Sequence, residues 1–237
     1  MGQQLYTPGQ SGNWTATIAG EVLVECWGGG GVGGGGNSNN QGGGGGAGGQ
    51  YAKTTYYVVK GTNYTYYAAP DKAGVGTDTD GPAGADSYLY DSSLATYIAR
   101  AKGGAGGLCY DNGGTGAAGS TDSGVGDTVY AGGDGADSGA GYGGGGGGGA
   151  GSTGTGNSAS TSTGGAAKDL NGGAGGNGGI GSSEPGSPGG DYGGGGGGST
   201  KNQTSGGGNG GYMKISWENI AGSRYDLNFR EYGFRTE

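Results

Sequence analysis

Alternation of apolar and polar residues predicts a few β-strands separated by long stretches without such alternation. Within residues 21–27, Val22, Val24 and Cys26 fall on one face, as in a strand with one buried side. Residues 212–218 alternate in the same way. No segment repeats its apolar residues at the 3.6-residue spacing of a helix. The pattern therefore predicts an all-β body.

Two further pairs of strands are predicted from segments rich in Tyr, Thr and Val, which favour extended backbone. Residues 51–59 and 63–68 are separated by three turn residues, and we expect them to form a hairpin. Residues 87–90 and 95–101 are predicted to form a second hairpin. The predicted strands thus lie near residues 5–27, 51–68, 87–101 and 212–218.

Glycine runs fill much of the chain between these strands, at residues 28–50 and 103–211. In residues 172–180 the pattern has a period of three residues. Polyproline-II backbone has three residues per turn and no internal hydrogen bonds, so regularly spaced Gly leaves a bare face to which a neighbouring backbone can bond. Collagen shares the period but needs Pro-rich triplets, and the chain has only 5 Pro. We predict an antiparallel β-sandwich-like body, within residues 1–218, with an inserted bundle of polyglycine-II helices.

The composition requires a core of this unusual kind. Gly supplies 74 of the 237 residues, whereas Leu, Ile, Val and Phe together supply 22. That share is below about 20%, where chains usually stay disordered for want of an apolar core. Gly also loses more backbone entropy on folding than any other residue. Hydrogen bonds between packed backbones are the compensation that we expect.

The charge and the chain start exclude several classes of protein. A formal net charge of −8 argues against nucleic-acid binding and against docking on an anionic membrane, because both need a basic surface. No apolar stretch is long enough for membrane insertion. The first residues lack the basic start and apolar run of a signal peptide, so we expect folding in the cytoplasm, with Cys26 and Cys109 reduced.

The residue types of common active sites are missing or scattered. The chain has no His, the commonest general base and a common metal ligand. Its carboxylates lie mostly in predicted turns, and a glycosidase that uses a carboxylate pair is the one catalytic alternative. Gly132–Asp137 fits one unit of a calcium-binding repeat that requires stacked copies. We predict no enzymatic activity, no metal site and no cofactor.

Several short motifs resemble the glycine-rich domain of bacteriophage tail-fibre proteins. They are Tyr6-Thr7-Pro8-Gly9, Trp14-Thr15, Val22–Gly31, Gln50-Tyr51 and Gly210–Trp217. The resemblance covers residues 5–218 and implies a virion protein, a receptor-binding adhesin at the tip of a tail fibre, made in the host cytoplasm. The implied partners are a bacterial surface receptor (a polysaccharide or an outer-membrane protein), other tail-fibre or virion proteins, and further copies of this chain.

The loops between the glycine runs are the predicted receptor contacts. A run that leaves the β body must be matched by one that returns, so successive loops alternate between a far end and a near end. Counting places residues 37–41, 110–112, 152–163 and 199–205 at the far end, and residues 120–131 and 182–192 near the body. The predicted receptor-binding residues are Asn37, Asn39, Asn40, Gln41, Tyr110, Asp111, Asn112, Asn157, Lys201, Asn202 and Gln203.

The long run 132–151 leaves one alternative open in this count. At about 3.1 Å per residue it would span about 60 Å. A fold-back near Tyr142 would shorten it and would exchange the ends of later loops.

Residues 219–237 differ in composition from the rest of the chain, because they hold three of its four Arg together with four aromatic residues. Such residues are enriched at interfaces, so we predict an attachment segment, with an unattached terminus as the alternative. The alternative function is a purely structural one, as a fibre spacer or a capsid decoration protein without receptor binding. Ice binding uses regular Thr or Ala arrays, which the irregular loops do not provide.

Overall fold

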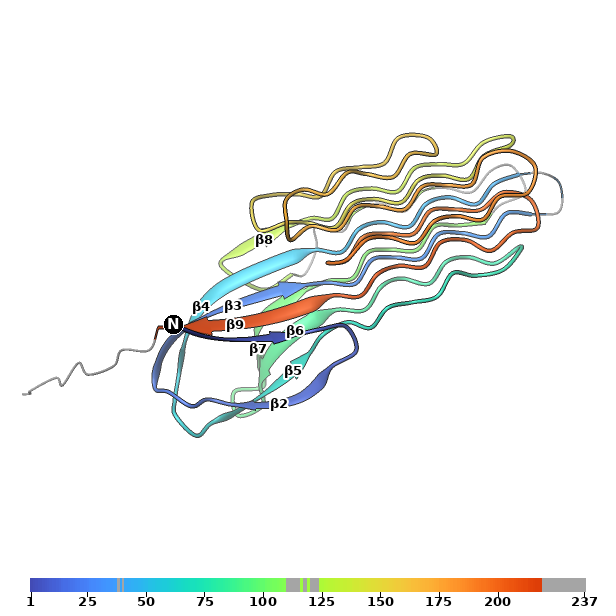
Figure 1. The fold of residues 1–237 in the computed structure, drawn as a ribbon. Helices are drawn as coiled ribbons and strands as arrows, with labels where there is room; N and C mark the ends of the chain where they lie inside the picture. Colours follow the sequence, from blue (N-terminus) through green and yellow to red (C-terminus); the bar gives the residue numbers. More distant parts are fainter. Residues whose placement is uncertain (38, 40, 110–115, 117–118, 120–123, 219–237) are drawn as a thin grey trace, which may run out of the picture.

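The computed structural model describes residues 1–37, 39, 41–109, 116, 119 and 124–218. Within them the chain forms strands and no helix, as predicted, and therefore no helix that could cross a membrane (Figure 1). The strands are β1 (Gly2–Tyr6), β2 (Ser11–Thr15), β3 (Gly20–Trp27), β4 (Tyr51–Val58), β5 (Asn63–Tyr67), β6 (Ser87–Asp91), β7 (Thr96–Ala101), β8 (Thr128–Tyr130) and β9 (Tyr212–Trp217).

Two antiparallel sheets enclose a small apolar core. One sheet has the order β1-β9-β3-β4-β8 and the other has the order β2-β5-β6-β7. The alternation predicted for β3 is confirmed, because Val22, Val24 and Cys26 are buried in a cluster with Leu89 and Ala99 of the other sheet. This β body forms one end of an elongated molecule.

One predicted hairpin is wrong and the other is confirmed. β4 and β5 are consecutive, but β4 pairs with β3 and β8 in one sheet, whereas β5 pairs with β2 and β6 in the other. The pairing of β4 with β3 extends over all eight residues of β4, more than the five residues of β5 would allow. The hairpin of β6 and β7 forms as predicted, with a bulge between Leu89 and Tyr90.

Beyond the sheets the chain runs back and forth along the molecule in extended segments that belong to no strand (Figure 1). Most of their described N–H groups donate to the carbonyl of another segment. The segments leaving the sheets are residues 28–36, 69–76, 102–109, 131–138, 155–160, 172–180 and 193–199. Those returning are residues 42–50, 79–86, 142–151, 163–168, 184–190 and 205–211.

The N–H groups of run 143–150 donate to three neighbouring runs in a repeating order. Successive N–H groups donate to residues 179, 43 and 161, then to residues 176, 46 and 157, then to residues 173 and 49. Every third N–H therefore reaches the same neighbouring run. Its carbonyls accept from three other runs, through the N–H groups of residues 133 and 136, residue 165, and residues 195 and 198. The run is thus bonded on all sides by six others.

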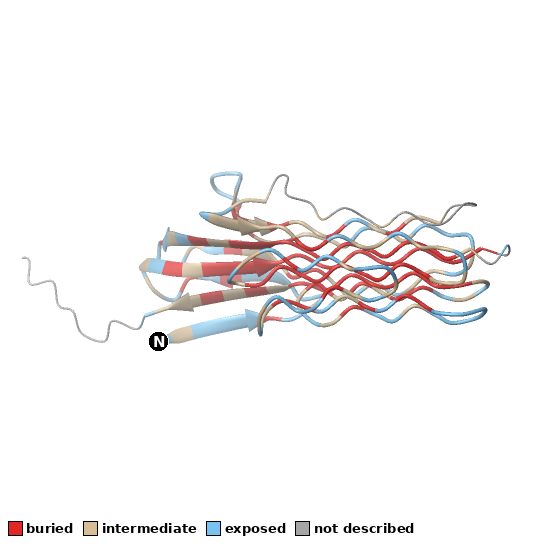
Figure 2. Ribbon diagram, turned by 90° about the horizontal axis from the view of Figure 1, so that it is seen from above, coloured by how far each residue is buried: buried red, intermediate tan, exposed pale blue. Residues whose placement is uncertain are grey.

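Burial follows the spacing of glycine in each run. Runs 28–36, 42–50, 143–150 and 193–199 are Gly at almost every position, and all their residues are buried (Figure 2). Run 172–180 repeats Gly-Gly-X, and its three X residues (Ala174, Asn177 and Ile180) are exposed. A run needs Gly wherever another backbone faces it, because a Cβ there would collide with a carbonyl oxygen.

A layer of aromatic rings joins the sheets to the glycine runs. Trp27, at the end of β3, packs against Tyr51 with 5.1 Å between ring centroids, and against Tyr192 with 5.3 Å. Tyr192 in turn stacks on Tyr212 with a centroid distance of 4.1 Å. Stacking of Tyr130 on Tyr51 extends the layer to β8. The layer fixes the direction in which several runs leave the sheets.

A buried carboxylate supports this layer from the sheet side. Glu25 accepts a hydrogen bond of 2.8 Å from the Tyr51 hydroxyl, and its other oxygen lies 2.6 Å from Lys214 Nζ. Burial raises the pKa of the Tyr51 hydroxyl above its usual range, and the hydrogen bond to Glu25 raises it further. The Tyr51 hydroxyl therefore stays protonated and remains a donor.

We predict that Gly146→Ala destabilises the protein, because the new Cβ would collide with the carbonyl of Gly195 in a neighbouring run. Overpacking of this kind lowers the free energy of unfolding by about 1–3 kcal/mol. Gly76→Ala is the matched control, since no heavy atom lies within 4 Å of its added Cβ. Chemical denaturation should show the loss for Gly146→Ala alone. Equal stability of the two variants would contradict the packing described for run 143–150.

Candidate binding surface at the far end of the bundle

The extended runs lie side by side as a bundle. Its far end consists of the turns that lie farthest from the sheets (Figure 1). Hydrogen bonds connect these turns to one another. The N–H of Gly36 donates to Ser199 Oγ (2.8 Å), and Ser138 Oγ donates to the carbonyl of Gly42 (2.6 Å). The turns therefore form one continuous surface. They are residues 36–42, 76–80, 138–142, 160–163, 180–184 and 199–205.

Asn37 organises the first of these turns. Its side-chain oxygen accepts hydrogen bonds from the N–H groups of Asn39 (3.0 Å) and Gln41 (3.1 Å). Its side-chain nitrogen donates to Gln41 Oε1 at 2.7 Å. An Asn that closes a turn in this way satisfies backbone groups that would otherwise lack partners. The Asn37 side chain is buried, while Asn39 is exposed at the tip.

The turn at residues 199–205 is held by two buried hydroxyls. Ser199 Oγ donates to the carbonyl of Gln203 at 2.7 Å. Thr200 Oγ1 accepts from the N–H of Glu184 (2.7 Å) and donates to the carbonyl of the same residue (2.9 Å). Asn202 lies at the tip, exposed, with a left-handed φ of 53° that Asn tolerates better than most residues. The backbone thus fixes where Lys201 and Asn202 project.

The neighbouring turn shows that run 131–151 folds back. Gly139 and Tyr142 exchange backbone hydrogen bonds of 3.1 and 3.3 Å across the turn, where Gly141 takes a φ of 83°. A backbone bridge joins Tyr142 to Ile180, whose side chain is 60% exposed. Tyr142 therefore lies at the far end, beside an exposed apolar residue.

The far-end surface is polar and carries few charges. Within its described turns the charged residues are Asp78, Asp80, Glu184 and Lys201. Two of the carboxylates serve the fold: Asp80 accepts from the N–H of Cys109 (2.7 Å), and Glu184 accepts from the N–H of Ile180 (3.2 Å). Among the described residues, no group of acidic or Cys side chains could hold a metal ion. The surface offers amides, hydroxyls and one ammonium group for hydrogen bonding.

A comparison with family models finds a match to the one described as "Glycine-rich domain", over residues 7–221. The match spans most of the chain. The chain belongs to this glycine-rich domain family. A comparison with curated proteins finds no significant match.

The glycine-rich domain brings some of the predicted binding residues together. Asn39, Gln41, Lys201, Asn202 and Gln203 lie in the far-end turns, as the alternation of runs predicts. Asn37 lies there too, but its side chain is used within the turn. Asn40 and residues 110–112 (Tyr110, Asp111 and Asn112) lie outside the described residues, as do residues 219–237.

Two predicted loop positions are wrong. Residues 152–163 are not one far-end loop, because a tight turn at residues 151–154 lies on the side of the sheets, and run 155–160 then leads to a far-end turn at residues 160–163. Asn157 lies within this run, where its carbonyl accepts from the N–H of Gly148. Residues 182–192 are not all near the sheets, since residues 180–184 are at the far end and only Tyr192 reaches the aromatic layer. Both errors arise because the chain folds back at Tyr142 and turns again at residues 151–154, which changes the end at which later loops lie.

Sequence reasoning missed Tyr142, Ile180 and Asp78 as members of the far-end surface. The Ser-Gly-Ala-Gly-Tyr segment at 138–142 interrupts the glycine run and is the one signal for its turn. The turn at 151–154 has a similar mark, because Ser152 and Thr153 interrupt the glycine run, but the sequence does not show that this loop ends at residue 154. Its neighbour Asp169 holds it by accepting from the N–H (3.0 Å) and hydroxyl (2.9 Å) of Thr153, and this contact depends on the fold itself.

We predict that Asn37→Ala and Asn39→Ala differ in their effect on stability. Asn37→Ala removes the acceptor of two backbone N–H groups in a buried turn, which should lower the free energy of unfolding by about 1–3 kcal/mol. Asn39→Ala removes an exposed side chain and should change it by less than about 0.5 kcal/mol. Urea denaturation of both variants checks this. A larger loss for Asn39→Ala than for Asn37→Ala would contradict the roles given to the two residues.

Proposed function

We propose that this glycine-rich domain is a receptor-binding adhesin at the tip of a bacteriophage tail fibre. In this proposal the extended runs are polyglycine-II helices, and the far-end surface binds the bacterial receptor. The proposal makes the chain a virion protein with a binding role and no catalytic one.

Two features support polyglycine-II geometry for the runs. The first is the rotation of hydrogen-bond partners with a period of three residues, which matches three residues per turn. The second is the sign of φ. None of the described glycines within runs 28–36, 42–49 and 143–149 has a positive φ, as expected for helices of a single hand.

The opposite placement of the far-end turns and of the outer ends of β1 and β9 carries the proposal for function. β1 begins at Gly2 and β9 ends at Trp217, and these two residues pair side by side at the end of the sheets away from the runs. The far-end turns lie at the other end of the molecule (Figure 1). A fibre component joined at the outer ends of β1 and β9 would therefore present the far-end turns outward.

The far-end surface is preorganised for recognition. Its turns are bonded to one another and to the ends of the runs, so little loop entropy would be lost on binding. The exposed amides of Asn39 and Asn202 and the ammonium of Lys201 suit hydrogen bonds to a sugar or to a loop of an outer-membrane protein. Tyr142 and Ile180 add apolar contact area beside them.

A purely structural role, as a fibre spacer or a capsid decoration protein, is the second candidate. It is favoured by the internal use of Asn37, Ser199 and Thr200, whose polar groups bond within the far end. In that role the turns only close the bundle. The two candidates differ in whether the exposed tips of those turns touch a bacterium.

We predict that the purified chain binds cells of some strains in a panel of bacteria, and that tip variants lose this binding. The variant combines Asn39→Ala, Lys201→Ala and Asn202→Gly, in which Gly keeps the left-handed φ. Cell binding of the fluorescently labelled chain should fall about ten-fold or more, as expected when a central contact is removed.

The matched control is Lys168→Ala with Leu170→Ala, two exposed residues in a turn on the side of the sheets. The control should bind like the wild type. Binding that survives the tip substitutions, or is lost equally in the control, would contradict the far-end surface as the binding site. Absence of binding to every strain would favour the structural candidate.

A further inference from the structure

Exposed apolar side chains gather at the end of the sheets away from the runs, which we call the body end. Met1, Tyr57, Val59 and Leu94 are 96%, 64%, 58% and 66% exposed. Met1 precedes β1, Tyr57 lies near the end of β4 and Val59 follows it, and Leu94 lies in the turn between β6 and β7. Leu170 and Ile180, which are also exposed, lie in other parts of the molecule. Several large exposed apolar side chains at one end of a molecule are typical of a surface that another segment covers.

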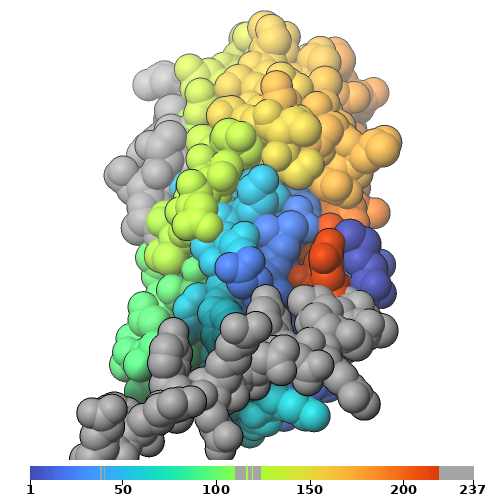
Figure 3. Space-filling model, turned by 90° about the vertical axis from the view of Figure 1, so that its left-hand side faces the viewer, coloured from blue at the N-terminus to red at the C-terminus, as the bar shows by residue number. Residues whose placement is uncertain are grey.

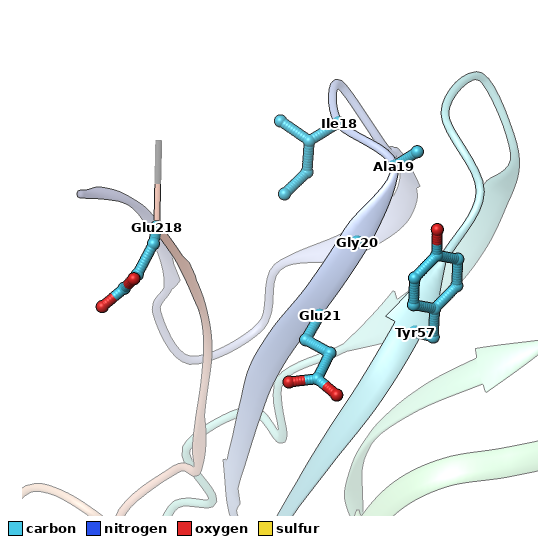
Figure 4. A pocket seen from close by; sticks show the side chains of 6 residues that line it. All are labelled: Ile18, Ala19, Gly20, Glu21, Tyr57 and Glu218. Atoms are coloured by element: carbon cyan, nitrogen blue, oxygen red, sulfur yellow. The ribbon is translucent and has the colours of Figure 1, made fainter. Parts of the chain in front are cut away.

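Figure 3 views the molecule from the body end, where residues at the start of the chain and at the end of β9 lie side by side. A hollow of about 490 Å³ opens here between the strands. Ile18, Glu21, Tyr57 and Glu218 line it together with Ala19 and Gly20 (Figure 4). The lining of the hollow thus combines apolar groups with two acidic residues and includes no described Lys or Arg.

The chain supplies a segment of matching chemistry at this place. Residues 219–237 continue from Glu218, which is itself part of the hollow. Tyr225, Leu227 and Phe229 alternate with polar residues, so an extended segment would place all three on one face. Arg224 is the first charged residue after Glu218. Apolar side chains could cover the exposed apolar residues of the body end, and a guanidinium group could pair with its carboxylates.

We propose that residues 219–237 bind the body end of their own chain. Tyr225, Leu227 and Phe229 cover Tyr57 and Val59, and Arg224 pairs with Glu21. The distance allows this, because Arg224 follows Glu218 by six residues, which reach at most about 20 Å when extended. A guanidinium fits a carboxylate better than an ammonium does, since it donates to both oxygens from two nitrogens at once.

This interaction differs from the use of residues 219–237 to attach another virion protein. A segment held on its own body end is protected in the isolated chain. An attachment segment is protected only when its partner is present. The two cases therefore predict different behaviour of the purified full-length protein, whichever receptor the far end binds.

Limited proteolysis of the full-length chain tests the proposal. Trypsin cleaves after Arg224 only when the segment leaves the body end, so the cleavage rate reports the open fraction. We expect Tyr57→Ser with Val59→Ser to speed the loss of residues 225–237 about ten-fold, as followed by intact mass. Leu170→Ser with Ile180→Ser is the matched control and should leave the rate unchanged.

A charge swap keeps the test valid if the first variant fails to fold. Glu21→Lys should speed cleavage after residue 230, and Arg224→Glu in the same chain should slow it again. The proposal is overturned if the wild type is cleaved as fast as the Tyr57→Ser, Val59→Ser variant. It is also overturned if protection disappears on dilution, because the segment would then bind a second copy.

Discussion

The hydrogen bond between the backbones of adjacent glycine runs is the interaction on which the rest of this structure depends. An ordinary core gains its stability from apolar side chains, and this chain has too few of them outside the sheets. Here the buried centre is formed by N–H and C=O groups that pair with six surrounding runs. Each such bond adds only about 0.5–1.5 kcal/mol, so the bundle relies on their number and on close packing of backbone against backbone. Both conditions exclude a Cβ at the facing positions.

The same constraint links the sheets to the far-end surface. Runs bonded at every third residue cannot slide past one another without breaking many bonds together, so their ends stay in register. The sheets set that register at the aromatic layer, where Trp27 and Tyr212 join two runs to strands and Tyr192 packs on both from the turn between two further runs. Asn37 and Ser199 close the opposite ends. The positions of the exposed tips are thereby determined by contacts made at the other end of the molecule.

The strands that alternate clearly could be predicted, and those that do not were missed or mispaired. β3 and β9 carry apolar residues at every second position, and their buried faces follow directly. β1 (Gly2–Tyr6) and β8 (Thr128–Tyr130) show almost no such alternation. They are short strands at the two edges of one sheet, and neither has a regularly buried face. The choice of partner for β4 depends on the competition between β3 and β5, which single-segment patterns do not contain.

For the candidate surface, alternation of the runs was enough for residues 37–41 and 199–205 but failed between them. The number of turns depends on where the glycine runs fold back, and the sequence does not distinguish a short break that turns, such as 138–142, from one that continues the run. Burial of the Asn37 side chain could not be predicted either. In the sequence, an Asn whose side chain is exposed looks the same as an Asn whose side chain closes a turn. The density of glycine was a usable signal, since all-Gly runs are central and Gly-Gly-X runs are peripheral.

Amide hydrogen exchange measured residue by residue tests the backbone core most directly. If run 143–150 is bonded to six neighbours, its amides exchange only when the whole domain unfolds, at rates as slow as those of β3. The amides of exposed far-end tips, such as Asn202, exchange much faster. Exchange of run 143–150 at the rate of an unfolded peptide, with β3 still protected, would contradict a core made of glycine backbone.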